Sequence, residues 1–278
     1  MSEFLAAIVG FRFMQYALLA CVLASVGCGM IGTFVVVKQL GSLAGGIAHA
    51  ILAGMGIAFF FGVSPMLGAT VMALFSAISI GLINLRMKQG EDVLIAAFWS
   101  VGMAVGILFI SQTPGYNVNL MSYLFGNILL VSGADLARML ALDVVILIVI
   151  RLYYRQFLAA AFDEEYARVR GVHVELFYIL LLTLIALTVV LLIQIVGLIL
   201  VIALLILPAA SAARFAGSLP RIMLFAVLLS LVSTLGGLAL SYNPDLPSGA
   251  VIVLLAGVIY IISVTIALYR ANRAKQPG

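Results

Sequence analysis

Residues 174–213 read VELFYILLLTLIALTVVLLIQIVGLILVIALLILPAASAA and contain one charged residue, Glu175. A helix needs about 20 apolar residues to cross the hydrocarbon core of a bilayer. This stretch holds enough apolar sequence for two crossings, separated by Gly197. It is therefore typical of a membrane protein and not of a soluble domain.

The rest of the chain has the same character. Of its 278 residues, 65% are hydrophobic and 9% are charged, whereas about 25% are charged in globular proteins. Too few polar side chains remain to cover a water-facing surface. The composition excludes a soluble enzyme, a nucleic-acid-binding module and a disordered protein.

The pattern of apolar runs predicts an all-α, polytopic fold that forms a single membrane domain over residues 1–278. Between the fourth and fifth runs, residues 119–132 read NLMSYLFGNILLVS, which is short for a crossing and suits a re-entrant helix. We therefore expect about nine transmembrane helices and one short re-entrant helix. The nine runs are residues 14–37, 43–61, 65–85, 92–110, 134–154, 174–195, 197–213, 220–242 and 248–269.

Lysine and arginine residues predict the orientation. Twelve of the fourteen fall in one alternate set of loops, and only Arg12 and Arg138 fall in the other. Because cytoplasmic loops are enriched in basic residues, we expect the N-terminus outside and the C-terminus in the cytoplasm. This parity requires that residues 119–132 do not cross. The twelve are Lys38, Arg86, Lys88, Arg151, Arg155, Arg168, Arg170, Arg214, Arg221, Arg270, Arg273 and Lys275.

The longest hydrophilic stretch is FDEEYARVRGV at residues 162–172, inside the cell by the charge pattern. It places acidic residues first, arginines last and Gly171 at the end, which is the order that complements a helix dipole and caps a helix. The pattern predicts a short cytoplasmic helix. Its self-capped form favours a docking element for another protein, and the alternative is a solvated connector.

Two ionisable residues lie inside predicted spans. His49 sits in LAGGIAHAILAGMG, where Gly45 and Gly46 leave room for a solute or for a close helix neighbour. Asp143 sits in LARMLALDVVILIVI. Such residues are functional candidates, and a neutral imidazole is a common metal ligand. The alternative for both is a structural hydrogen bond between helices.

Five segments in order carry a family resemblance: GSLAGGIAHAILAGMGIA, NLMSYLFGNILL, FDEEYARVRG, VGLILVIALLILPAASAARFA and DLPSGAVIVL. Together they resemble the membrane permease of the manganese, zinc and iron family of bacterial ABC importers. The resemblance implies a homodimer in the bacterial inner membrane, two cytoplasmic ATP-binding subunits and an extracytoplasmic metal-binding protein.

The resemblance also implies roles for single residues. The chain lacks the G-x-x-x-x-G-K-[ST] motif of an ATP site, so ATP is expected on the partner subunit, with no catalytic residue and no resident cofactor in this chain. The transported metal ion is expected near His49, with Gly45 and Gly46 lining the pathway. The residues that match the coupling helix of the family are Phe162, Asp163, Glu164, Glu165, Ala167, Arg168 and Gly171.

One position departs from the family. The family motif resembles G-D-x-x-x-H-A, whose Asp and His share a helix face, and Gly45 stands here at the Asp position. A hard ion such as Mn²⁺ loses a carboxylate that it favours, whereas Zn²⁺ loses less. Asp143 is a candidate replacement ligand, and a chelated cargo is the other explanation.

Two other functions compete with an ABC permease. In a proton-coupled secondary transporter, His49 and Asp143 would relay protons and no ATPase would be needed. Such a carrier has no use for a docking helix at residues 163–171. A purely structural membrane subunit would tolerate the loss of His49.

Overall fold

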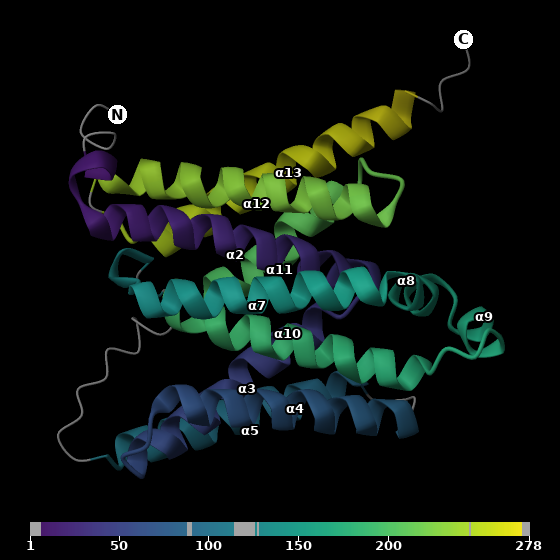
Figure 1. Cartoon of the computed structure of the whole chain (residues 1–278), viewed down its shortest axis with the longest axis horizontal. Helices are drawn as coiled ribbons and strands as arrows, with labels where there is room; N and C mark the ends of the chain where they lie inside the picture. The colour runs from purple at the N-terminus through teal and green to yellow at the C-terminus, as the bar shows by residue number, and fades with distance from the viewer. Residues whose placement is uncertain (1–6, 88–90, 114–125, 127, 245, 274–278) are drawn as a thin grey trace.

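The computed structural model describes the whole chain except residues 1–6, 88–90, 114–125, 127, 245 and 274–278. The described part contains helices and no strands, as the sequence predicts. The helices run back and forth along one common direction (Figure 1). They are α2 (Arg12–Val37), α3 (Gly41–Phe60), α4 (Pro65–Met87), α5 (Glu91–Ser111), α7 (Gly133–Leu152), α8 (Tyr154–Phe162), α9 (Glu164–Val169), α10 (Val174–Val196), α11 (Leu198–Ala213), α12 (Leu219–Tyr242) and α13 (Ser248–Arg273), with one 3₁₀ turn, η1 (Ile128–Leu130).

Seven described helices are long and apolar enough to cross a membrane, namely α2, α3, α4, α5, α10, α12 and α13. The other two predicted spans correspond to α11, which has 16 residues, and to α7. The latter carries Asp135, Arg138, Asp143 and Arg151, so its composition is less clearly that of a crossing helix. Of the nine predicted spans, seven are therefore supported by the length and composition of the described helices.

The predicted re-entrant helix falls mostly outside the described residues. The described portion of residues 119–132 includes the 3₁₀ turn η1, which packs against α2 and α10. Helix α5 ends and α7 begins at the same end of the bundle, the left end in Figure 1.

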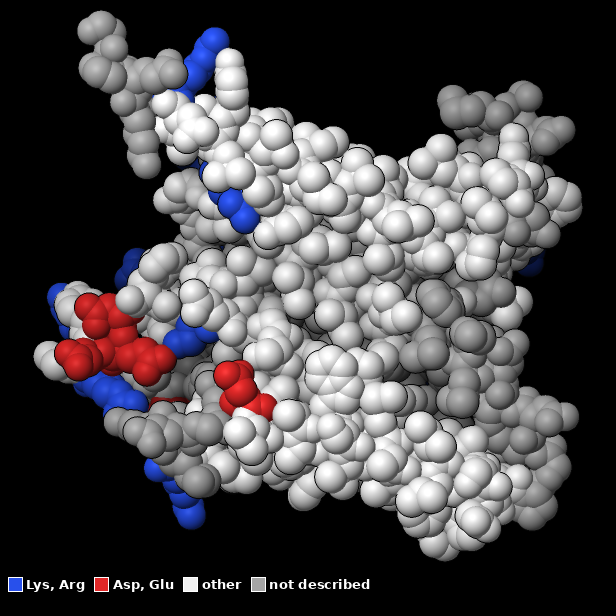
Figure 2. Space-filling view, turned by 180° about the vertical axis from the view of Figure 1, so that it is seen from behind, with Lys and Arg blue, Asp and Glu red and all other residues white. Residues whose placement is uncertain are grey.

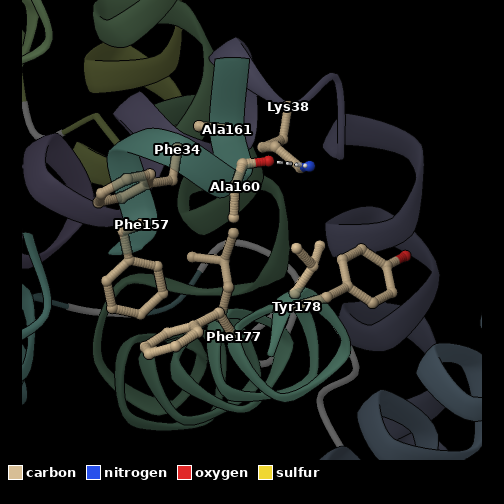
Figure 3. A pocket seen from close by; sticks show the side chains of 9 residues that line it. Phe34, Lys38, Phe157, Ala160, Ala161, Phe177 and Tyr178 are labelled. Atoms are coloured by element: carbon tan, nitrogen blue, oxygen red, sulfur yellow. Dashed lines mark hydrogen bonds between the residues drawn. The ribbon is translucent and has the colours of Figure 1, made fainter. Parts of the chain in front are cut away.

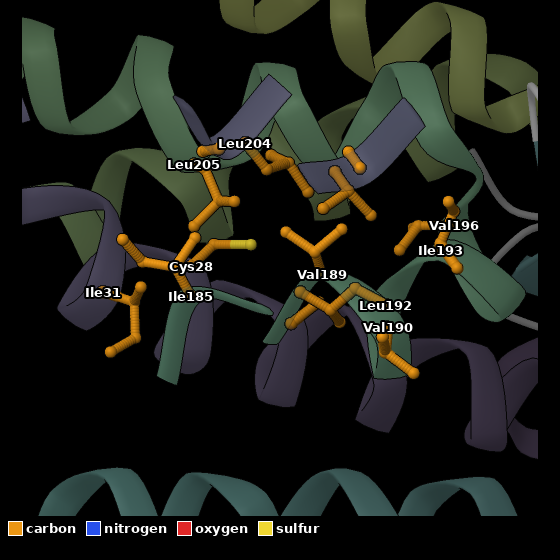
Figure 4. Close-up of a cluster of buried hydrophobic side chains, with 14 of the residues drawn as sticks. Cys28, Ile31, Ile185, Val189, Val190, Leu192, Ile193, Val196, Leu204 and Leu205 are labelled. Carbon is orange, nitrogen blue, oxygen red and sulfur yellow. The ribbon is translucent and has the colours of Figure 1, made fainter. Parts of the chain in front are cut away.

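Helix α2 lies at the centre of the bundle. It packs against α7, α11 and α12, and small residues let the backbones approach. A methyl group on Gly32 would overlap the carbonyl oxygen of Leu205 in α11, and one on Gly29 would lie 2.5 Å from Cγ2 of Val227 in α12. The core continues between α2, α10 and α11, where Cys28 packs among Ile185, Val189 and Leu204 (Figure 4).

Helices α3, α4 and α5 form a separate layer below the centre in Figure 1. Glycines on facing helices meet in two places. Gly54 of α3 lies against Gly68 of α4, and Gly56 of α3 lies against Gly106 of α5. An added methyl group at any of these positions would meet the backbone of the neighbouring helix, so the small residues in this layer determine how closely the helices pack.

Charged side chains gather at one end of the molecule (Figure 2). This is the end at which α8 and α9 lie and at which α13 finishes, whereas α2 begins at the opposite end (Figure 1). Helix ends supply several of the basic residues, including Arg86 in the last turn of α4 and Arg270 in the last turn of α13. The two ends of the bundle therefore differ strongly in charge.

Candidate functional site

His49 lies in the middle of α3 and is covered by a side chain of α5. The rings of His49 and Trp99 are stacked, with centroids 4.1 Å apart and planes inclined by 9°. The Nδ1 atom of His49 is buried and has no hydrogen-bond partner among the described residues. The imidazole thus carries a nitrogen that no described protein group uses.

The two glycines before His49 have different surroundings. A Cβ atom on Gly45 would meet only Cζ3 of Trp99, at 3.9 Å, which is an ordinary contact. A Cβ atom on Gly46 would lie 2.7 Å from Cγ2 of Ile95, so the absence of a side chain there brings α3 and α5 together. That either residue lines a pathway stays a prediction.

Asp143 lies on α7 and is 8% exposed. Its carboxylate faces α2, where a Cβ on Gly27 would lie 2.7 Å from Oδ1. Thr188 and Leu192 of α10 line the same small cavity. The Oδ2 atom is buried without a hydrogen-bond partner in the described part of the chain.

The structure places His49 and Asp143 in different helix contacts. His49 lies between α3 and α5, whereas Asp143 lies where α7 meets α2 and α10. Within the described residues, no three His, Cys, Asp or Glu side chains form a group that could hold a metal ion. A metal site made of both residues stays a prediction.

The predicted cytoplasmic helix is present as α9. Asp163 caps its start by accepting a hydrogen bond from the Tyr166 backbone N–H at 2.9 Å, and Glu164 and Glu165 occupy the first turn. Gly171 follows its end with φ of 79°. Phe162 is not part of this helix, because the chain bends at Asp163 and Phe162 ends α8.

The end of α9 is closed by a pair of backbone hydrogen bonds. The Gly171 N–H donates to the carbonyl of Arg168 and the Val172 N–H donates to that of Ala167, both at 3.0 Å. This pattern is a Schellman motif, in which a glycine adopts the left-handed conformation. The side chain of Arg168 also pairs with Glu175 of α10 at 2.9 Å. These contacts hold a six-residue helix that is too short to be stable alone.

One face of α9 is buried and another is open. Ala167 is fully buried against Ala160 of α8 and Val174 of α10. Tyr166 is 51% exposed and Val169 is 87% exposed, although both carry large apolar side chains. Neither residue is among the positions predicted for docking. Their three-residue spacing within an otherwise charged helix is the signal that would have found them.

Long apolar helices packed side by side, with charged residues gathered at one end, are typical of a multi-pass membrane protein. The chain belongs to the ABC 3 transport family, whose sequence profile matches residues 10–267. The family resemblance of the sequence is thereby confirmed.

Several relatives extend the match over nearly the whole chain. A probable metal transport system membrane protein of Chlamydia pneumoniae is 43% identical, and the match covers 89% of this chain and 87% of the chlamydial protein. The manganese transport system membrane protein MntC of Halalkalibacterium halodurans is 32% identical over 97% of this chain and 95% of its own. The solved structure of PsaBC from Streptococcus pneumoniae in complex with Fab matches with a TM-score of 0.85 and 31% identity, covering 94% of each chain.

Proposed function

We propose that this chain is the permease subunit of an ATP-driven ABC importer. Its cargo is a divalent transition-metal ion, namely zinc, manganese or iron, which crosses the bacterial inner membrane. The family match and the relatives named for metal and manganese transport support this cargo class.

The observation that carries the proposal is the exposed apolar face of α9 at the charged end of the bundle. Tyr166 and Val169 project from a helix that is capped at both ends and held against α8 and α10. Exposed apolar side chains on a rigid, water-facing element are typical of a protein contact. The partner that fits is a cytoplasmic ATP-binding subunit, which α9 engages as a coupling helix. Two copies of this chain then form a homodimer with two such subunits.

The charged end supports an orientation for the chain. If the end rich in lysine and arginine faces the cytoplasm, then α2 starts outside and α13 finishes inside. Helix α5 ends and α7 begins at the outer end, which agrees with a connection that does not cross the membrane. Counting α7 and α11 as crossings gives nine spans. An extracytoplasmic metal-binding protein would deliver the ion at the outer end.

The transport step follows from this arrangement. The partner subunits hydrolyse ATP, so this chain supplies no catalytic residue and no resident cofactor. Their closure displaces α9, and access to the pathway alternates between the two sides. His49 is the proposed contact for the ion, because its buried Nδ1 has no described partner and imidazole nitrogen suits Zn²⁺ and Fe²⁺ better than Mn²⁺. Since ATP drives transport, the contact at His49 needs to hold the ion only transiently.

The competing proton-coupled carrier is not favoured. It would use His49 and Asp143 as a relay, yet the two side chains lie in different helix contacts. It also leaves the exposed face of α9 without a role. Asp143 remains a proposed second contact for the ion, and the substitution Asp143→Asn tests it in the same assay.

The test is reconstitution of the chain with its ATP-binding partner and binding protein in proteoliposomes. We expect ATP-dependent uptake of one radiolabelled ion among Mn²⁺, Zn²⁺ and Fe²⁺. Val169→Asp should abolish co-purification of the ATP-binding subunit and uptake together. Val9→Asp is the matched control, since Val9 is 82% exposed at the opposite end. Uptake driven by a proton gradient without ATP would overturn the proposal.

A further inference from the structure

Lys38 joins the end of α2 to both short helices of the charged end. It is the residue that follows Val37, and its ammonium donates to the carbonyl oxygen of Ala160 in α8 at 2.8 Å. The same ammonium pairs with Oε1 of Glu164 in α9 at 2.5 Å. Figure 3 shows the Lys38 side chain reaching the carbonyl oxygen of Ala160 at the edge of a pocket that aromatic side chains also line. Its side chain is 14% exposed, so little of it remains in contact with water.

Aromatic side chains also pack where α2, α8 and α10 come together near Lys38. The rings of Phe34 in α2 and Phe157 in α8 lie 5.4 Å apart. Phe157 also meets Phe177 of α10 edge to face at 5.4 Å. Helix α8 is therefore seated between α2 and α10, and Lys38 adds the only described ion pair between α2 and α9.

The position of Lys38 also links α9 to the helix that carries His49. The chain turns sharply at Gln39, which has φ of 57°, and α3 begins at Gly41. His49 is eight residues into α3, about 12 Å along its axis. A displacement of Lys38 thus acts directly on the first turn of α3.

Helix α2 itself is fixed within the bundle. The close approaches of Gly32 to Leu205 and of Gly29 to Val227 leave no space between α2 and its neighbours α11 and α12. A displacement at the end of α2 is therefore shared with these two helices, because closely packed elements move together.

We propose that Lys38 is a positioning residue that holds α9 on the α2–α3 junction, so that displacement of α9 reaches His49. This inference rests on the proposed function, in which the partner subunits move α9. The Glu164 side chain is 51% exposed, and an ion pair that water reaches on one side contributes little stability. The role proposed for Lys38 is therefore to link α9 to α2. A single ammonium serves two acceptors on two helices, which a neutral side chain of the same length cannot do.

The test compares Lys38→Met with wild type in the reconstituted complex, by counting ions imported per ATP hydrolysed. We expect the variant to co-purify with the ATP-binding subunit and to hydrolyse ATP, while ions per ATP fall about fivefold or more. Lys38→Arg should retain coupling. Lys38→Glu should lose it, and adding Glu164→Lys should restore part of it, because the ion pair can form again between the same two positions. A purely structural role would lower ATP hydrolysis and ion import together and leave ions per ATP unchanged.

A second readout does not depend on transport. Amide hydrogen exchange across residues 164–169 should accelerate in Lys38→Met, because α9 loses its attachment to α2. Unchanged exchange, or unchanged ions per ATP, overturns the inference alone. Absence of ATP-dependent uptake in the wild-type complex overturns the proposed function and this inference with it.

Discussion

The imidazole of His49 lies flat against the indole of Trp99, with ring centroids 4.1 Å apart. The two residues come from α3 and α5, which are in contact along much of their length. Trp99 is the single tryptophan of the chain. Its fluorescence therefore reports on the one intramembrane histidine without any engineered label.

A metal ion that binds His49 should change the emission of Trp99. We expect Mn²⁺, which is paramagnetic, to quench the purified chain in a saturable manner, because the ion would sit within a few ångströms of the indole. Fluorescence titration in detergent measures this effect. His49→Ala should remove the saturable component and leave only collisional quenching. Identical titrations of the two proteins would remove His49 from the ion pathway.

Restoring the acidic residue of the family motif should shift ion preference. At Gly45, a Cβ would meet only Trp99 at 3.9 Å, so an aspartate side chain can start there without a clash. We expect Gly45→Asp to raise Mn²⁺ uptake relative to Zn²⁺ several-fold, because Mn²⁺ favours a carboxylate oxygen. Competition between the two radiolabelled ions measures the ratio.

Gly45→Asn is the control for this experiment, since it has the same shape without the charge. It should leave the Mn²⁺ to Zn²⁺ ratio near that of wild type. If Gly45→Asn and Gly45→Asp shift the ratio equally, the effect comes from side-chain size and the carboxylate is not a ligand.

The left-handed glycine after α9 should be needed for docking. An alanine at Gly171, where φ is 79°, costs about 1 kcal/mol. We expect Gly171→Ala to loosen α9 and to weaken binding of the ATP-binding subunit about fivefold. A pull-down titration checks this. Gly217→Ala is the control, because Gly217 has open space and no positive φ. Equal losses in both variants would contradict the role of the turn.

The buried carboxyl group of Asp143 should lower the thermal stability of the folded chain. A carboxyl group at mid-span costs about 2.5 kcal/mol or more on insertion scales, and Oδ2 has no partner in the described structure. We expect Asp143→Asn to raise the thermal midpoint of the purified chain by a few degrees. A fall in the midpoint would show that the carboxylate is satisfied in the membrane, for instance by a bound ion. The same variant tests its contribution to metal uptake.

Replacing Gln39 by glycine should raise the thermal stability of the chain. It is the one described non-glycine residue with positive φ, at 57°, and this conformation costs an L-residue about 1 kcal/mol. We expect Gln39→Gly to raise the thermal midpoint by about 2 °C. Gly62→Ala should do the reverse, since Gly62 occupies the equivalent turn after α3 with φ of 68°. Two shifts of the same sign would contradict this account.

The helices could be predicted from the sequence because apolar length and polar breaks determine where a membrane helix starts and stops. The predicted run at residues 174–195 became α10, which ends one residue later, and the capped helix before Gly171 became α9. Between two of these helices, Asn84 of α4 donates a hydrogen bond from Nδ2 to the hydroxyl of Tyr178 in α10 at 2.9 Å.

The contacts of the candidate site could not be predicted in the same way. Helical periodicity shows that a residue faces protein and does not show which helix it faces. Nothing in the sequence pairs His49 with Trp99, or Lys38 with Glu164, because these partners are far apart in the chain. The break at Asp163 was also missed, since the capping signals of α8 and α9 overlap there.

The glycine contacts of α3 affect how mutational scans of this chain should be interpreted. Gly54 and Gly56 touch the backbones of α4 and α5 at Gly68 and Gly106. Alanine, the usual neutral substitute, is the damaging choice at these positions, because its methyl group forces neighbouring helices apart. A scan would therefore mark Gly54 and Gly56 as essential because of their packing, whether or not they meet an ion. In α3, the loss of function caused by an alanine substitution at a glycine reports how closely the helices pack. Only substitutions that keep the side-chain volume constant test whether a residue has a chemical role.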